Sequence, residues 1–428
     1  MPLRIGYLTT GSSRDMGNWS GLVRHIRDSL EDCGHDIYDL DGFVPRIPWA
    51  TRTRGWRARF LMGKPYGYDR DVRLALSFAA LADEKIARLS LDCVVSAQTY
   101  PATMLRTSVP VASWCDATFH ALMDVYPGYS DISEDSIRQG HYLERRAIQR
   151  SCFLAYASEW AAADAIQYYG GDPDKIAVIP FGANCAAGFS SLAEARSAVL
   201  AKAASPFRLL FVGRDWNRKG GALAVEVLNE LRQQRINAEL WVVGCEPFAG
   251  APPPGVKVIG PLNKANASDL AQWRECFAQS DVLFVPTRAE CFGVVFAEAA
   301  AFALPSVSTR VGGVGDAVVD GVTGFLFAPE EDARPYVEIL RRLARNRRFY
   351  SQSAVNAFTY YRRTLNWASA GQRFSELLME RLERDVRDRA DGGSTAGSRR
   401  DSRVRSTTSS LNDFTSLPGA EPRYAIDN

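Results

Sequence analysis

Residues 281–327 read DVLFVPTRAECFGVVFAEAAAFALPSVSTRVGGVGDAVVDGVTGFLF, and this stretch decides the fold. An apolar run of strand length, residues 282–285, is closed by Pro286. A loop that carries Glu290 follows, and then a helix that is apolar on all sides except at Glu298. Such a helix is expected to be buried, so Glu298 needs a partner or a ligand. A capping or salt-bridged glutamate is the alternative to a functional one.

Glu290 and Glu298 lie eight positions apart, the first in the loop after a strand and the second in the following helix. Both are expected to face the crevice where open α/β sheets bind ligands. The segment E-C-F-G-x-x-x-x-E, between a strand and a glycine-rich loop, resembles the E-x7-E signature of retaining GT-B glycosyltransferases of family four. The resemblance implies that Glu298 holds the ribose of a nucleotide-sugar and that Glu290 faces the donor sugar. It also implies donor contacts at Phe292, Gly293 and Val294.

A second segment of this kind follows the strand expected at 208–212 and reads GRDWNRKG. Arg214 and Lys219 lie in a strand-to-helix loop, after Gly213. Two cations at a helix start are unfavourable for the helix dipole, a cost that a bound anion would remove. The loop is similar to the family's G-R-x-x-x-x-K-G, which implies that Arg214 and Lys219 hold the donor diphosphate.

The glycine-rich loop that ends the organising stretch departs from the family. Glycines 312, 313 and 315 permit close backbone approach to a ligand. Where the family has Pro-Glu, this chain has Gly315 and Asp316. We expect this difference to alter contacts to the base or the sugar.

The first half of the chain opens as a strand, a glycine-containing loop and a helix. The loop does not read G-x-G-x-x-G, which argues against a nicotinamide or flavin site. Its GNWSG is similar to the family's glycine loop over the donor diphosphate and the acceptor, and this implies roles for Gly17, Ser20 and Gly21. An ordinary strand-to-helix turn is the alternative.

The strand expected at 109–113 ends in WCDATFH. The family places a His or Asp at this point, near the donor sugar and the acceptor hydroxyl. Asp116 matches that position better than His120, one turn further on, because a lone histidine is more often structural.

Composition narrows the classes of function. A chain of 428 residues is long enough for two domains. Its 46% hydrophobic and 23% charged residues are typical of a globular protein. A net charge of +2 gives no bulk attraction to nucleic acid. The eight cysteines show no C-x-x-C spacing and read as reduced thiols. No apolar run is long enough to cross a bilayer, and the N-terminus lacks a signal-peptide pattern, so we expect a cytoplasmic location.

Residues 46–64 are rich in Arg, Trp and Phe. Such a segment can attach to an anionic membrane surface, which here would be the inner face of the membrane. A solvated loop and helix face is the alternative, and the composition favours it.

We therefore predict an α/β protein of the GT-B fold, with two Rossmann-like doubly wound domains facing a cleft. The predicted divisions are an acceptor domain (1–185), a nucleotide-sugar domain (186–365), a helix that returns to the first domain (366–387) and a disordered tail (388–428).

The resemblance implies retaining transfer of a sugar from a nucleotide-diphosphate sugar, UDP- or GDP-linked, to a glycan, lipid-linked or small-molecule acceptor. Fixed cations would stabilise the departing diphosphate, so no metal or other cofactor is expected. A non-catalytic sugar-nucleotide-binding module and a GT-B sugar-nucleotide epimerase are the alternatives.

Overall fold

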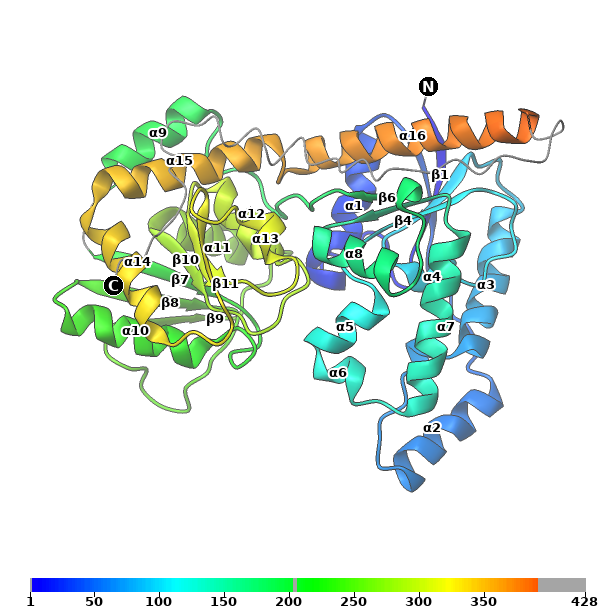
Figure 1. The fold of residues 1–428 in the computed structure, drawn as a ribbon, viewed down its shortest axis with the longest axis horizontal. Helices are drawn as coiled ribbons and strands as arrows, with labels where there is room; N and C mark the ends of the chain where they lie inside the picture. The colour runs from blue at the N-terminus through cyan, green and yellow to red at the C-terminus, as the bar shows by residue number, and fades with distance from the viewer. Residues whose placement is uncertain (1, 203–205, 392–428) are drawn as a thin grey trace.

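Two six-stranded parallel sheets organise the computed structural model, which describes residues 2–202 and 206–391 (Figure 1). The first has the order β2-β1-β3-β4-β5-β6 and the second β12-β11-β10-β7-β8-β9. The expected GT-B architecture of two doubly wound domains is confirmed. The tail predicted from residue 388 lies mostly outside the described residues.

The strands of the first sheet are β1 (Arg4–Leu8), β2 (Asp36–Leu40), β3 (Cys93–Ser96), β4 (Val111–Cys115), β5 (Phe153–Tyr156) and β6 (Ile176–Val178). Helices α1 (Leu22–Asp32), α2 (Trp49–Leu61), α3 (Val72–Ile86), α4 (Thr99–Ala102), α5 (Phe119–Val125), α6 (Pro127–Ser130), α7 (Glu134–Arg150) and α8 (Glu159–Gln167) surround it, with 3-10 turns η1 (Asn18–Gly21), η2 (Tyr68–Arg70) and η3 (Pro173–Lys175).

The second sheet contains β7 (Phe207–Val212), β8 (Ala238–Val243), β9 (Val256–Gly260), β10 (Val282–Val285), β11 (Ser306–Thr309) and β12 (Gly324–Phe327). Its helices are α9 (Leu192–Ala201), α10 (Gly221–Gln233), α11 (Ala267–Gln279), α12 (Val294–Ala301), α13 (Val314–Ala317), α14 (Ala333–Arg345) and α15 (Arg347–Arg363). Most of these strands are apolar, as expected for a parallel sheet covered by helices on both faces. Strand β10, with the sequence VLFV, is fully buried.

The last helix, α16 (Trp367–Asp391), runs back across the first domain (Figure 1). It packs on α1. Its Phe374 ring stacks on Trp114 of β4, with ring centroids 4.9 Å apart. Because both side chains are completely buried, α16 is part of the core of the first domain.

Strand order locates the ligand crevice of each domain. In the second sheet the chain moves outward from β7 to β9 and then returns to place β10 on the other side of β7. Loops at the carboxyl ends of β7 and β10 therefore leave the sheet in opposite directions and open a crevice. These are the loops that carry GRDWNRKG and TRAECFG.

Candidate functional site

The loops after β7 and β10 meet through a buried ion pair. Lys219 Nζ contacts Glu290 Oε2, and both residues are less than a tenth exposed. A glycine makes this approach possible: Gly220 has φ +77°, and a Cβ there would lie 2.0 Å from the carbonyl oxygen of Pro286. The structure thus brings together two residues that the sequence assigned to donor binding.

Arg218 joins this pair, although the sequence analysis did not select it. Its Nη1 donates to the carbonyl oxygen of Ala289 at 2.7 Å and lies 3.5 Å from Glu290 Oε2. Arg214, by contrast, is exposed and has no hydrogen bond or ion pair to any described residue. The two cations that contact Glu290 at the crevice are therefore Arg218 and Lys219. The adjacency of the two basic residues in the loop was the available signal.

Glu298 is paired as well. It is 5% exposed in α12, and Oε1 contacts Nζ of Lys264, from the segment between β9 and α11. Lys264 also lies over the ring of Trp273, 4.1 Å from its centroid. The apolar helix predicted a partner or a ligand for this carboxylate, and in this structure its partner is Lys264.

Phe292, Gly293 and Val294, for which the motif predicts donor contacts, lie at the start of α12. Gly293 has φ +81° and precedes the first helical residue, Val294. Phe292 is buried, with its ring edge-to-face against Phe181 of the first domain at 5.6 Å.

Two of the three glycines that follow β11 lie close to other atoms of the protein. The sequence had suggested instead that a ligand lies close to them. A Cβ at Gly312 would lie 1.9 Å from the carbonyl oxygen of Glu290, and one at Gly313 would meet Cys291 and Ser158. Gly315 has nothing within 4 Å of its added Cβ. The first two glycines therefore hold the Glu290 loop in place, and only Gly315 borders open space.

The first domain faces this cluster with Asp116 at the end of β4. Burial raises the pKa of Asp116 to about 7, and the negative charge of Glu290 contributes in the same direction. Beside it, Ala117 packs with Cys291, and Arg218 lies over the ring of Tyr126 at 5.3 Å. His120 instead hydrogen-bonds through Nδ1 to Asp164 at 2.6 Å, and Asp116, unlike His120, lines the cavity beside the cluster.

The glycine loop of the first domain is strained. Trp19, Ser20 and Gly21 all have left-handed backbone angles, with φ of 48°, 57° and 85°. Left-handed non-glycine residues cluster at functional sites. Trp19 lines the same cavity as Asp116, while Gly17 and Ser20 are exposed. The loop therefore reaches the same cavity as Asp116.

Residues 2–202 and 206–391 lack both a cluster that could hold a metal ion and a helix that could span a membrane. No cluster of three or more His, Cys, Asp or Glu side chains there is arranged to hold a metal ion. No helix there is both long and apolar enough to span a bilayer.

Comparison with known proteins finds a family model and relatives that match part of the chain. Residues 206–346 match the family model described as glycosyl transferases group 1. D-inositol 3-phosphate glycosyltransferase from Arthrobacter sp. (strain FB24) is 34% identical over 193 residues, which cover 43% of this chain and 45% of the relative. The protein of the same name from Frankia alni is 29% identical over 279 residues, covering 61% and 67%. The chain thus spans about half the length of the first of these relatives.

Solved structures are similar over most of the chain. Sucrose-phosphate synthase from Thermosynechococcus elongatus has a TM-score of 0.64 at 16% identity and covers 89% of this chain and 100% of that one. Anabaena Alr3699/HepE, in complex with UDP-glucose, has a TM-score of 0.57 at 16% identity and covers 88% and 100%. At such identities these likenesses establish the fold.

Proposed function

We propose, from the match of residues 206–346 to the family model of the group 1 glycosyl transferases, that the protein transfers a sugar from a nucleotide-diphosphate sugar to a hydroxyl-bearing acceptor. We propose further that the transfer retains the anomeric configuration. The observation that carries the proposal is the convergence of Arg218, Lys219 and Glu290 at the switch point of the second sheet, opposite Asp116. Alr3699/HepE, which has the same fold, binds UDP-glucose.

The reaction breaks the bond between the anomeric carbon and the diphosphate oxygen and forms one from that carbon to the acceptor oxygen. Negative charge grows on the leaving diphosphate. Lys219 and Arg218 are already fixed where they would stabilise that charge, with no reorganisation at the moment of reaction. The acceptor proton passes to the leaving phosphate oxygen. In this scheme the fixed cations perform the electrostatic task, and no metal ion is required.

The other residues have positioning roles. Glu290 exchanges its contact with Lys219 for hydroxyls of the donor sugar, and Glu298 exchanges Lys264 for the ribose hydroxyls. Arg214, which is exposed beside the crevice, folds over the diphosphate once the donor is bound. The glycine loop at Gly17, Ser20 and Gly21 closes over the same group.

The test is transfer measured by mass spectrometry with UDP- and GDP-sugars, with and without a panel of acceptors. Lys219→Ala and Glu290→Ala should each lower kcat/KM by roughly a hundredfold, as expected for loss of a preorganised contact to developing charge. Arg334→Ala, an exposed arginine on α14, serves as the control. Unchanged turnover in both site variants would refute these roles, and sugar isomerisation without acceptor would indicate an epimerase.

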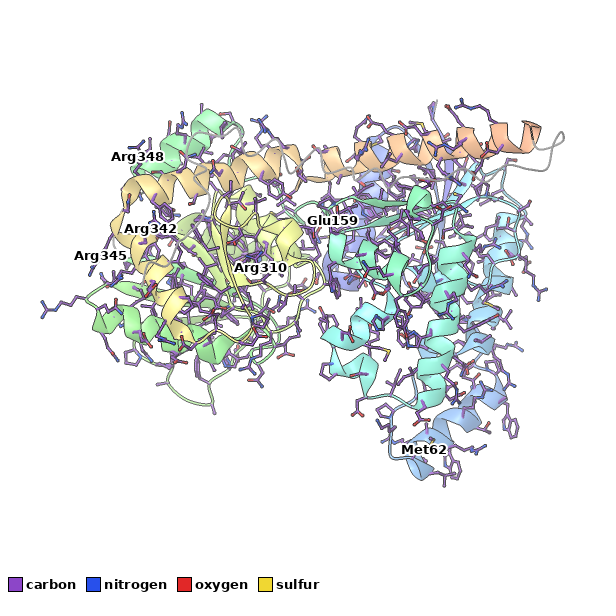
Figure 2. All side chains as sticks on the ribbon, in the orientation of Figure 1. Met62, Glu159, Arg310, Arg342, Arg345 and Arg348 are labelled. Carbon is purple, nitrogen blue, oxygen red and sulfur yellow. The ribbon has the colours of Figure 1, made fainter. Side chains whose placement is uncertain are left out.

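We also propose that the first domain docks on an anionic membrane surface through α2. Helix α2 packs inward through small residues, Thr51, Gly55 and Ala58. Its large side chains point outward: Trp49 is 80% exposed and Phe60 65%. Figure 2 shows Met62 at the far tip of this helix, away from the second domain.

The positive charge of α2 and its flanking residues favours an anionic surface as the partner. No acidic residue occurs between Asp41 and Asp69, whereas Arg52, Arg57 and Arg59 are exposed on α2. Aromatic residues interleaved with arginines suit the interface of a bilayer that contains anionic lipids. The active site would then work at the inner face of the membrane.

Vesicle co-sedimentation tests this docking. The protein should bind phosphatidylcholine vesicles only when they contain phosphatidylglycerol, and Trp56→Ser with Phe60→Ser, or Arg57→Glu with Arg59→Glu, should abolish binding. Arg341→Glu on α14 is the charge control. Equal binding by all variants would refute the role of α2.

A further inference from the structure

A cavity of about 630 Å³ penetrates the first domain from the point where Asp116 faces the second. Every residue that lines it belongs to the first domain. Asp116, Trp19 and Tyr126 line it together with Arg70 and Glu144. A pocket of this size suits a small polar molecule or the headgroup of a larger one.

Arg70 is the unusual feature of this cavity. It is 9% exposed, and its Nε has no hydrogen-bond partner among the described residues. Its guanidinium lies over the rings of Phe119 and Tyr129, at 4.8 and 5.6 Å from their centroids. The nearest carboxylate oxygen, of exposed Asp69, is 3.5 Å from Nε.

The rings compensate the faces of the guanidinium but not its edge, where the N–H donors lie. A planar fork of donors with an open edge binds a carboxylate or a phosphate in bidentate geometry. The ion pair with exposed Asp69 is long and engages only Nε, so it compensates this buried cation incompletely, and the site gains stability when an anion enters.

Glu144 lies in the same cavity and also has unused hydrogen-bonding capacity. It is 3% exposed; Oε2 accepts a hydrogen bond from Thr99 Oγ1 at 2.8 Å, and Oε1 has no partner in the described chain. Thr99, Gln98 and Tyr100 line the wall beside it. This end of the cavity therefore presents groups that hydrogen-bond hydroxyls.

We propose that the acceptor is a hydroxyl-bearing molecule with an anionic group, phosphate or carboxylate, which Arg70 binds while Glu144 holds its neighbouring hydroxyls. This inference rests on the proposed function, and it names the acceptor class for that site. The reacting hydroxyl points to Asp116 and the donor. Arg70 is thus an acceptor-binding residue that sets specificity. A free phosphorylated or acidic sugar and the headgroup of an anionic lipid both have this chemistry.

Binding is tested first, without any donor. Calorimetric titrations compare glucose 6-phosphate with glucose, glycerol 3-phosphate with glycerol, and glucuronate with glucose. At least one anionic member should bind tenfold or more tightly than its neutral counterpart. Arg70→Met keeps the packing between Phe119 and Tyr129 but should remove that preference, whereas Arg73→Ala, an exposed arginine on α3, should leave it unchanged. Glu144→Gln should weaken both members of a pair equally.

Transfer from UDP- and GDP-sugars then distinguishes the two sources. Product in the aqueous phase with glucose 6-phosphate identifies a soluble acceptor, and product extracted with phosphatidylglycerol vesicles identifies a lipid headgroup. The proposal is overturned if no anionic molecule in either arm is preferred, or if Arg70→Met retains the preference. Should Arg70→Met fail to fold, Arg70→Lys replaces it, because a point charge without the planar fork should lose most of the preference. Anion preference without any transfer would overturn the proposed function, and only the anion-binding role of Arg70 would then stand.

Discussion

At the scale of single residues, a buried ion pair links the two loops of the site. Lys219 and Glu290 are both nearly buried, and each compensates the other. Removing one partner of such a pair leaves an uncompensated buried charge, which is strongly destabilising. The donor diphosphate can replace Glu290 at Lys219, and hydroxyls of the donor sugar can replace Lys219 at Glu290, so donor binding exchanges one set of contacts for another. The same exchange applies to Glu298 and Lys264.

A buried carboxyl in the acceptor cavity gives a prediction about stability and pH. Burial raises the pKa of Glu144 to about 7. The folded chain therefore retains a proton that the unfolded chain loses at acidic pH, so this residue's contribution to stability is present in acid and is lost as pH rises toward and through 7.

Glu144→Gln removes that titration while keeping a similar shape. The variant should gain up to about 3 kcal/mol relative to wild type between about pH 4.5 and pH 8. Urea unfolding across this range measures the difference. A difference that does not change with pH would show that Glu144 titrates normally in the folded protein.

At the scale of elements, the order of strands determines which loops meet. Motif spacing predicted Lys219 and Glu290 because each motif lies within one strand-loop-helix unit, where sequence and structure correspond closely. Arg70 and Glu144 were not predicted, since η2 and α7 come together only through the packing of the first domain. Arg218 was missed because the family pattern directed attention to Arg214.

The glycine-rich turn after β11 supports the Glu290 loop, and this gives a prediction at the same scale. Gly312 has φ +50°, and its added Cβ would meet the carbonyl oxygen of Glu290 at 1.9 Å. Gly312→Ala should displace that loop, since alanine adopts this backbone conformation only with strain. Donor-dependent activity should fall by roughly tenfold or more for a displacement of about 1 Å.

Gly250→Ala, at an exposed glycine of the same domain, is the matched control, because an added Cβ there meets nothing within 4 Å. Thermal stabilisation by UDP and steady-state transfer provide the readouts. Equal behaviour of the two variants would mean that Gly312 does not position Glu290.

At the scale of the whole molecule, the two-domain architecture followed from the sequence and is confirmed, since apolar strand runs and glycine-containing loops alternate along the chain. The contacts between the domains did not follow from it. Asp316, where the family has Glu, accepts a hydrogen bond from the backbone N–H of Glu159, at the start of α8 in the first domain, at 3.2 Å. Sequence showed only that the position departs from the family pattern.

That contact predicts that the arrangement of the domains depends on pH. Burial raises the pKa of Asp316 to about 7, and the carboxylate of Glu159 adds to the effect. Figure 2 shows Glu159 on the side of the first domain that faces the second. When the domains separate, Asp316 becomes solvated and its pKa returns toward the ordinary value. The closed arrangement therefore binds the proton, and raising the pH through 7 favours the open one.

Small-angle X-ray scattering tests this directly. The radius of gyration should be larger at about pH 8.5 than at about pH 6. In the closed form, ionised Asp316 lies buried beside Glu159, which costs free energy, whereas in the open form it is solvated. Asp316→Asn keeps a hydrogen-bond acceptor without the charge, so it should remain closed at both values. Asp320→Asn, which removes an exposed carboxylate of the same domain, should behave as wild type. A radius that does not change with pH in wild type, or that changes equally in Asp316→Asn, would show that this contact does not govern closure.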